Sequence, residues 1–130
     1  MAIGKSLVEE DKVELAKELL AEAEAKGTKL WLPLDHVVSK EFRGDALASL
    51  TQDEQVPDDM MALDIGPETV AAYLDVLRSA RTVLWNGPMG VFEMEAFASG
   101  TLAMAESLAE AADRGAFVLV GGGDSVAAAN

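Results

Sequence analysis

Three consecutive glycines, Gly121–Gly123, lie between an apolar run and a helical pattern that begins at Asp124 and Ser125. Glycines at such a junction let bare backbone approach a ligand, and the first turn of a helix offers unpaired N–H groups to an anion. A tight turn that only packs a helix against a strand needs a single glycine. The triple glycine therefore favours a phosphate site, with a purely structural turn as the alternative.

The carboxylate of Asp124 refines this hypothesis. At the start of a helix it is favourable as a cap and needs no ligand. Beside a phosphate it would repel, unless a cation such as Mg²⁺ lies between the two groups. Asp124 is thus either a cap or a contact to a metal–nucleotide complex, and Ser125 is a second oxygen contact or the alternative cap.

Two familiar phosphate loops do not fit this segment. A Walker-type loop requires Gly-Lys-Ser/Thr, and the segment contains no lysine. A dinucleotide fingerprint requires a further glycine where Val126 stands, which makes a hydride-transferring dehydrogenase the least favoured class. The motif therefore points to phosphate without either of these loop types.

A second glycine loop, Trp85–Glu93, combines a shaped turn with apolar residues. Val91 and Phe92 could form a wall for a flat aromatic base, and Glu93 could accept a hydrogen bond from a ribose hydroxyl. The alternative, equally compatible with the residues, places Trp85, Val91 and Phe92 in the core and Glu93 in solvent.

Regular elements must position these loops. A Ser6/Glu9 capping box predicts a helix that stops at Gly27, followed by a strand over Leu30–Leu34 and a long connection with a short strand near Val37. Three apolar runs then each lead through a glycine loop into a helix. They cover residues 60–65, 82–85 and 116–120, and their helices begin at Pro67, near Glu95 (with a break near Gly100) and at Asp124.

This repeated order predicts an α/β fold, a three-layer, Rossmann-like open parallel sheet. Ligands of such folds bind where the loops leaving the strands gather along one edge. The loops at Gly66, Asn86–Gly90 and Gly121–Gly123 are therefore expected to share one crevice.

Composition narrows the classes of partner. The chain has 130 residues, enough for one domain, and 23 acidic against 10 basic residues give a net charge of −13. Such a surface disfavours nucleic acid and anionic membranes. No apolar run is long enough to span a bilayer and no secretion signal is visible, so a cytoplasmic location is expected. The one histidine, His36, stands apart from other ligand types, so a structural or surface role is expected in place of catalysis.

Four segments together resemble the phosphoglycerate kinase family. They are WNGPMGVFE at 85–93, GGGDS at 121–125, LDIGP at 63–67 and IGKSLVEEDK at 3–12. The resemblance runs from about residue 3 to the end and identifies residues 1–130 as part of that family's C-terminal, nucleotide-binding domain. It implies reversible phosphoryl transfer between 1,3-bisphosphoglycerate and Mg·ADP, which gives 3-phosphoglycerate and ATP in glycolysis.

The resemblance also implies roles for single residues. Ala62 and Leu63 flank the adenine, and Glu93 binds the ribose. The rest of the adenosine site is Asn86, Pro88 and Val91. The phosphates lie at Gly122, Gly123, Asp124 and Ser125, with Asp124 towards Mg²⁺. Gly123 is the catalytic residue that the resemblance implies, because its amide lies near the transferred group. The family usually has glycine where Ala62 stands, so the extra methyl group is expected to crowd the base.

Phosphoryl transfer also needs cationic side chains, and the three glycine loops contain none. Arg81, Arg114 and Lys29 precede predicted strands and are expected at the opposite edge of the sheet. The family's lysine-bearing loop and 3-phosphoglycerate site lie outside this sequence. We therefore expect an inactive segment of the enzyme that retains most of the nucleotide cradle and self-associates through exposed sheet edges. The alternatives are a stand-alone nucleotide- or phosphate-binding module and a domain fragment that only folds.

Overall fold

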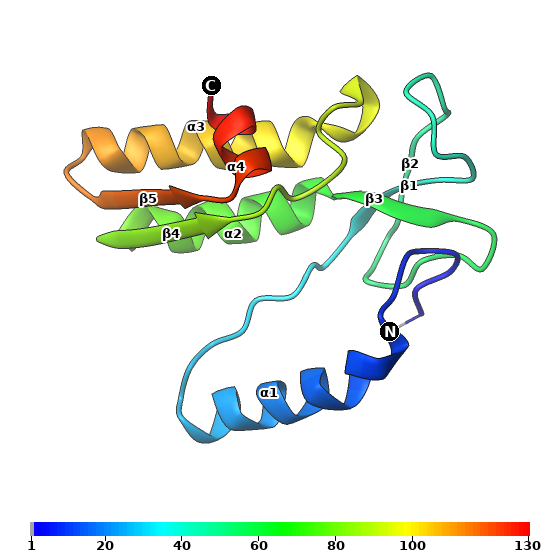
Figure 1. Ribbon diagram of the computed structural model, residues 1–130, viewed down its shortest axis with the longest axis horizontal. Helices are drawn as coiled ribbons and strands as arrows, with labels where there is room; N and C mark the ends of the chain where they lie inside the picture. Colours follow the sequence, from blue (N-terminus) through cyan, green and yellow to red (C-terminus); the bar gives the residue numbers. More distant parts are fainter. Residues whose placement is uncertain (1) are drawn as a thin grey trace.

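The computed structural model describes residues 2–130 and contains two small sheets with helices between and beside them (Figure 1). The strands are β1 (His36–Ser39), β2 (Ser49–Leu50), β3 (Met61–Ile65), β4 (Thr82–Asn86) and β5 (Phe117–Gly121). The α-helices are α1 (Val13–Ala25), α2 (Pro67–Ser79), α3 (Ser99–Asp113) and α4 (Gly123–Ala129). Two 3₁₀ turns, η1 (Glu10–Lys12) and η2 (Glu95–Phe97), precede α1 and α3. The predicted α/β class is confirmed.

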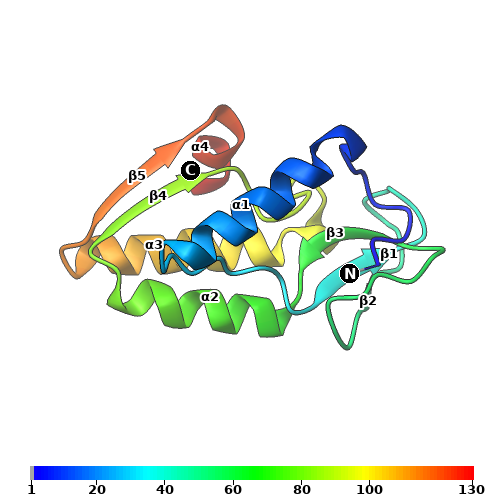
Figure 2. The same ribbon diagram turned by 90° about the horizontal axis from the view of Figure 1, so that it is seen from below.

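β4 and β5 form a parallel pair, in register from Thr82 opposite Phe117 to Asn86 opposite Gly121. Alternate residues of both strands, Val83, Trp85, Val118 and Val120, pack with residues of α2 and α3. Both helices lie on the same side of the pair (Figure 2). Trp85, Met104 and Leu108 form the centre of this core. A period of two along the strands and an apolar stripe on each helix account for this packing.

β3 does not join that parallel pair, which corrects the prediction of three parallel strands. It pairs antiparallel with β1, which in turn pairs antiparallel with β2, in a separate sheet of order β2-β1-β3. The reason is that a short apolar run indicates a buried strand but carries no information about its partner or direction. The short strand predicted near Val37 is β1.

The start of the chain also differs from the prediction. The Ser6 hydroxyl does not cap a helix; it accepts a hydrogen bond from the Ala62 amide at 2.9 Å and so ties the N-terminal segment to β3. α1 begins only at Val13 and has no buried residue. It ends as predicted, since Gly27 adopts a positive φ of 70° and the next amide, of Thr28, returns to the Ala23 carbonyl.

Residues Leu30–Leu34 were predicted as a strand but pair with no strand within the described chain. They run beside α2, where the Tyr73 hydroxyl donates to the Trp31 carbonyl at 2.9 Å. The far face of the β4–β5 pair is open: Leu84, Phe117 and Leu119 are 66%, 65% and 52% exposed. Within the described residues this face of the pair is therefore largely uncovered.

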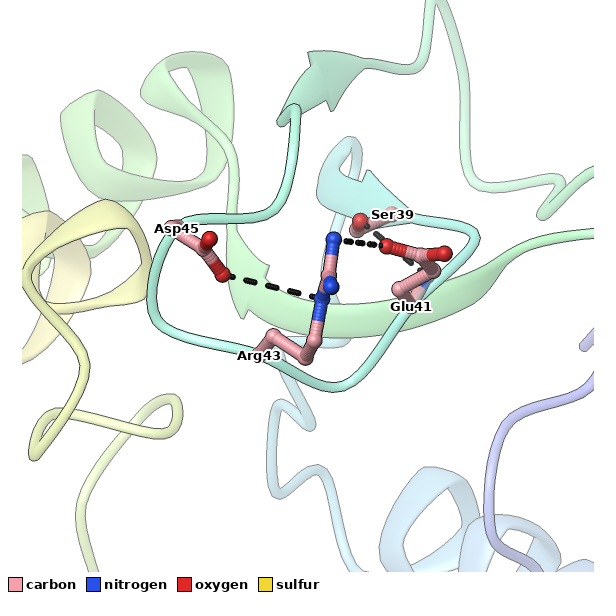
Figure 3. A network of polar contacts seen from close by, with 4 residues as sticks. All are labelled: Ser39, Glu41, Arg43 and Asp45. Atoms are coloured by element: carbon pink, nitrogen blue, oxygen red, sulfur yellow. Dashed lines mark hydrogen bonds and ion pairs between the residues drawn. The ribbon is translucent and has the colours of Figure 1, made fainter.

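The connection between β1 and β2 is organised around Arg43, whose guanidinium pairs with Glu41 and, at 3.6 Å, with Asp45 (Figure 3). All three side chains are exposed, and such pairs each contribute about 0–1 kcal/mol to stability. The charge of Arg43 is thus neutralised by its own loop. Among residues 2–130 no helix combines the length and the apolar character needed to cross a membrane.

Candidate functional site

The two glycine loops that follow β4 and β5 lie against each other, as the parallel pairing predicts. Asn86 and Gly121 are opposite one another at the carboxyl ends of the strands. The Asn86 side chain lies over Gly122, the residue after Gly121. A Cβ built on Gly122 would stand only 3.2 Å from the Asn86 Oδ1. Gly122 also has a φ of +84°, which side-chain-bearing residues rarely adopt. The positive φ favours glycine at position 122, and a side chain there would also displace the Asn86 amide group.

Ser125 lies beneath this junction and not on its surface. It is fully buried in the first turn of α4, and its Oγ accepts a hydrogen bond from the Gly87 amide at 2.6 Å. The expectation from the sequence placed its hydroxyl at the phosphates or on its own helix as a cap. The structure instead gives the hydroxyl a partner in the other glycine loop.

The rest of the β4 loop is anchored by a residue that sequence reasoning missed. The buried Thr101 Oγ1 in α3 accepts hydrogen bonds from the amides of Met89 and Gly90, at 3.1 and 3.2 Å. The next amide, of Val91, donates to the Leu63 carbonyl of β3 at 2.9 Å. No pattern around Thr101 indicated this role, because a helical threonine usually serves as a solvent-facing residue or a cap.

A buried carboxylate supports the same loop from below. Asp64 is 4% exposed, and its carboxylate oxygens accept hydrogen bonds from the amides of Ile65 and Gly100, each at 2.8 Å. Burial raises the pKa of the Asp64 carboxyl, and these two hydrogen bonds oppose that shift only in part. A Cβ on Gly90 or Gly100 would overlap the carboxylate, so both glycines are required by this close approach.

A cavity of about 300 Å³ opens between β3 and the β4 loop. Three residues that the sequence assigned to the adenosine site line it: Ala62, Leu63 and Val91. The other lining residues are Pro33, His36, Asp64, Ile65, Met89 and Gly90. Its size and largely apolar walls suit a flat ring system.

The sequence left two interpretations of the second loop, a wall for a base or packing in the core, and its residues divide between them. Trp85 is 5% exposed and belongs to the core, as the structural alternative required. Val91, Phe92 and Pro88 are half-buried, and Glu93 is exposed. The adenosine and ribose roles of these residues stay predictions.

Gly66 is buried and is not among the residues that line the cavity between β3 and the β4 loop, so its expected place in the crevice stays a prediction. Its amide donates to the Asp35 carbonyl at 3.0 Å, and it packs against the Asp35 side chain. β3 contributes to the site through Leu63 and Asp64 instead.

The segment that the sequence assigned to the phosphates is open to solvent. Gly122, Gly123 and Asp124 are exposed, and Asp124 stands in the first turn of α4. Within residues 2–130 no group of three or more His, Cys, Asp or Glu side chains could hold a metal ion. A single exposed carboxylate still fits Mg²⁺, because this ion commonly takes one or two carboxylates and completes its shell with water and phosphate oxygens.

Arg81 and Arg114 lie away from this edge, as the sequence predicted. Arg81 directly precedes β4, and Arg114 ends α3 just before β5, so both stand at the amino ends of the strands. Lys29 lies over the ring of Trp31, 6.0 Å from its centroid. His36 is buried, with Nε2 3.2 Å from the Glu54 carbonyl, in agreement with a structural role.

Glycine loops at the carboxyl ends of parallel strands are typical of α/β proteins that bind ligands at this edge of the sheet. Comparison with known proteins identifies the family. The model of the phosphoglycerate kinase family matches residues 1–130. The chain belongs to the phosphoglycerate kinase family. The phosphoglycerate kinase of Clostridium novyi is 57% identical over 128 residues, covering 98% of this chain and 31% of the relative. The chloroplastic phosphoglycerate kinase 1 of Arabidopsis thaliana is 52% identical and is covered to 27%.

Solved structures of phosphoglycerate kinases support the same family assignment. The phosphoglycerate kinase of Coxiella burnetii superposes with a TM-score of 0.92 at 40% identity, over 98% of this chain and 32% of that structure. The enzyme of Pyrococcus horikoshii gives a TM-score of 0.70 at 33% identity, over 91% of this chain and 28% of that structure. The chain spans about a third of the length of the relatives it matches.

Proposed function

We propose that this chain supplies the adenosine wall and the phosphate loop of a phosphoglycerate kinase nucleotide site, which binds ADP or ATP together with Mg²⁺. The observation that carries the proposal is the junction of the two glycine loops, where Asn86 reaches over Gly122 and Ser125 holds Gly87. One nucleotide spans an apolar wall and an anion site, and the junction brings these two features to one edge.

The adenine ring occupies the cavity between β3 and the β4 loop. Ala62 and Leu63 flank the ring, and Val91 completes the wall of the same cavity. Asn86 and Pro88 continue the adenosine site toward the phosphates. The exposed Glu93 is free to accept a hydrogen bond from a ribose hydroxyl.

The phosphate chain lies along Gly122, Gly123 and Asp124. Their amides precede or open α4, so they have no acceptor one helical turn earlier and can donate to phosphate oxygens. The Gly123 amide lies near the transferred group. Asp124 would hold Mg²⁺, which neutralises charge on the phosphate oxygens when it is bound.

In the whole enzyme this site serves phosphoryl transfer between 1,3-bisphosphoglycerate and ADP. Transfer requires positive charge around the moving group, whereas Arg81 and Arg114 stand at the other end of the strands and Arg43 is paired with Glu41 and Asp45 in its own loop. The chain spans only about a third of its relatives, and the 3-phosphoglycerate site belongs to the remaining part. We therefore infer that the chain alone binds nucleotide and does not transfer the phosphoryl group.

Calorimetric titration with ADP, with and without Mg²⁺, tests this proposal. Asp124→Asn is expected to weaken Mg·ADP about tenfold and to leave metal-free ADP unchanged, because only the metal-dependent contact is lost. Asp113→Asn, an exposed acid at the end of α3, is the matched control. No heat with the unaltered chain would contradict nucleotide binding, and equal weakening of both ligands would contradict the metal role. Turnover by a purified sample would contradict the inference that the chain is inactive.

A further inference from the structure

Ser125 occupies a position that its proposed contact with phosphate does not explain. Its side chain is fully buried, whereas Gly122, Gly123 and Asp124 beside it are exposed. A ligand arriving at the open side of the loop meets these three residues and not the serine hydroxyl.

The hydroxyl is instead shared between the two loops. Regular pairing of β4 and β5 ends at Asn86 and Gly121. One residue later, the Gly87 amide donates to the Ser125 Oγ at 2.6 Å, and a Cβ on Gly122 would stand 3.9 Å from the same oxygen. The Ser125 Oγ thus extends the connection between β4 and β5 one residue past the end of their backbone pairing.

We propose that Ser125 is a positioning residue, whose hydroxyl fixes the loop at Gly87 to the loop at Gly122. The apolar wall and the phosphate amides are then held at one separation before nucleotide binds. This inference rests on the proposed nucleotide site. Its physical basis is preorganisation: a loop that is already fixed loses less conformational freedom on binding.

The other anchors of the β4 loop do not replace this one. Thr101 holds Met89 and Gly90 to α3, and the Leu63 carbonyl holds Val91 to β3. These contacts connect the loop to its own support. Among the hydrogen bonds of residues 2–130, the bond from Gly87 to Ser125 joins the loop to the phosphate segment beyond the strands.

Amide hydrogen exchange measures this connection without any ligand. In Ser125→Ala the Gly87 amide is expected to exchange at least about tenfold faster, because it loses its acceptor, while the Gly90 amide held by Thr101 keeps its protection. Protection at Gly90 also shows that the variant is folded. Ser125→Thr retains the hydroxyl and is expected to keep Gly87 protected. Ser107→Ala, at another buried serine in α3, is the control and should change neither amide.

Binding separates a positioning role from direct contact with phosphate. If Ser125 positions the loops, Ser125→Ala weakens adenosine and Mg·ADP alike, by about five- to tenfold, the effect of one hydrogen bond. Ser125→Thr restores both affinities. Weakening of Mg·ADP with adenosine unchanged would overturn the inference in favour of a phosphate contact, and so would unaltered exchange at Gly87 in Ser125→Ala. Failure of the unaltered chain to bind either ligand would reject the proposed nucleotide site, and Gly87 exchange would then decide alone whether Ser125 joins the loops.

Discussion

Asp35 caps a helix that begins far along the chain: its Oδ1 accepts hydrogen bonds from the amide of Thr69 at 2.8 Å and from the hydroxyl of Thr69 at 2.6 Å. Its Oδ2 accepts the Glu68 amide at 3.0 Å. The local N-cap of α2 is Gly66, which has no side chain to do this. Two of the unpaired amides of the first turn are therefore satisfied by a carboxylate that directly precedes β1.

Replacement of this carboxylate is expected to destabilise the fold. Asp35→Asn keeps one acceptor oxygen, places an NH₂ group against a helix amide and removes a charge that the helix N-terminus favours. We expect a loss of about 2–3 kcal/mol in the free energy of unfolding at neutral pH, the range for hydrogen bonds to charged groups. Urea denaturation followed by the fluorescence of the buried Trp85 measures it. Asp58→Asn, at an exposed aspartate, is the control, and equal stability of the two variants would contradict the role of the cap.

The two buried aspartates should respond to pH in opposite directions. Burial tends to raise the pKa of the Asp35 carboxyl, but the hydrogen bonds from Thr69 and Glu68 outweigh it and hold the pKa below its ordinary 3.8. Its contribution to stability is therefore present above pH 3.8 and is lost as the pH falls through the lowered value. Burial raises the pKa of Asp64, so its contribution is complete below pH 3.8 and is lost as the pH rises through the raised value.

Denaturation between about pH 3 and pH 7 tests these signs, with Asn variants as references that do not titrate. The cost of Asp35→Asn should shrink toward acid, whereas the cost of Asp64→Asn should shrink toward neutral pH. Parallel trends for the two variants would show that one of the two pKa directions is wrong.

Gly100 provides a steric test of the support beneath the β4 loop. A Cβ at this position would overlap the Asp64 carboxylate and approach Ile65. Gly100→Ala is expected to cost about 1–3 kcal/mol, the usual penalty of overpacking, although alanine is normally favoured over glycine in a helix. Gly44→Ala is the control, because its Cβ would meet only Met94, at 4.0 Å. A thermal melt in which Gly100→Ala is neutral or stabilising would show that this contact can relax.

Much of this arrangement could be predicted from local signals. Glycine stops, Pro67 at the start of α2 and alternating apolar residues in β4 and β5 each depend on nearby residues, so the sequence displays them. The loops after β4 and β5 meet because parallel strands end at one edge.

The remaining features depend on contacts across the chain. Ser6 pairs with Ala62, Asp35 caps α2 from a distance, and Thr101 holds amides in another loop. None of these residues has a neighbour in sequence that reveals its partner. The prediction of a capping box at Ser6 was wrong for this reason. The Ser6 hydroxyl accepts a hydrogen bond from the Ala62 amide in β3 and does not cap a helix.

The open face of the β4–β5 pair predicts self-association. Leu84, Phe117 and Leu119 are more than half exposed on one face, and β4 pairs only with β5 within residues 2–130. A second copy could bury this face or extend the sheet. Light scattering at micromolar concentration is expected to show dimers or larger species, more so in high salt, which screens the net charge of −13.

Variants locate that contact. Leu84→Thr combined with Leu119→Thr introduces β-branched residues, which suit a strand, and removes apolar area, so the scattering mass should fall to that of a monomer. Leu47→Thr, on a loop distant from β4 in sequence and 87% exposed, should have no effect. A monodisperse monomer of the unaltered chain would contradict the prediction.

Ala62 tests the adenine end of the proposed site. Its methyl group belongs to the wall of the cavity between β3 and the β4 loop, where the resemblance to the family indicates glycine. If the base enters this cavity, Ala62→Gly should relieve crowding and tighten adenosine and Mg·ADP by a similar, roughly two- to tenfold, factor. The same change is expected to cost about 0.5–1 kcal/mol of stability, because glycine weakens a strand. Calorimetry and urea denaturation of the same sample separate the two effects. Unchanged or weaker binding in a folded variant would mean that the methyl group does not face the base, and the adenine would then have to be sought elsewhere along the β4 loop.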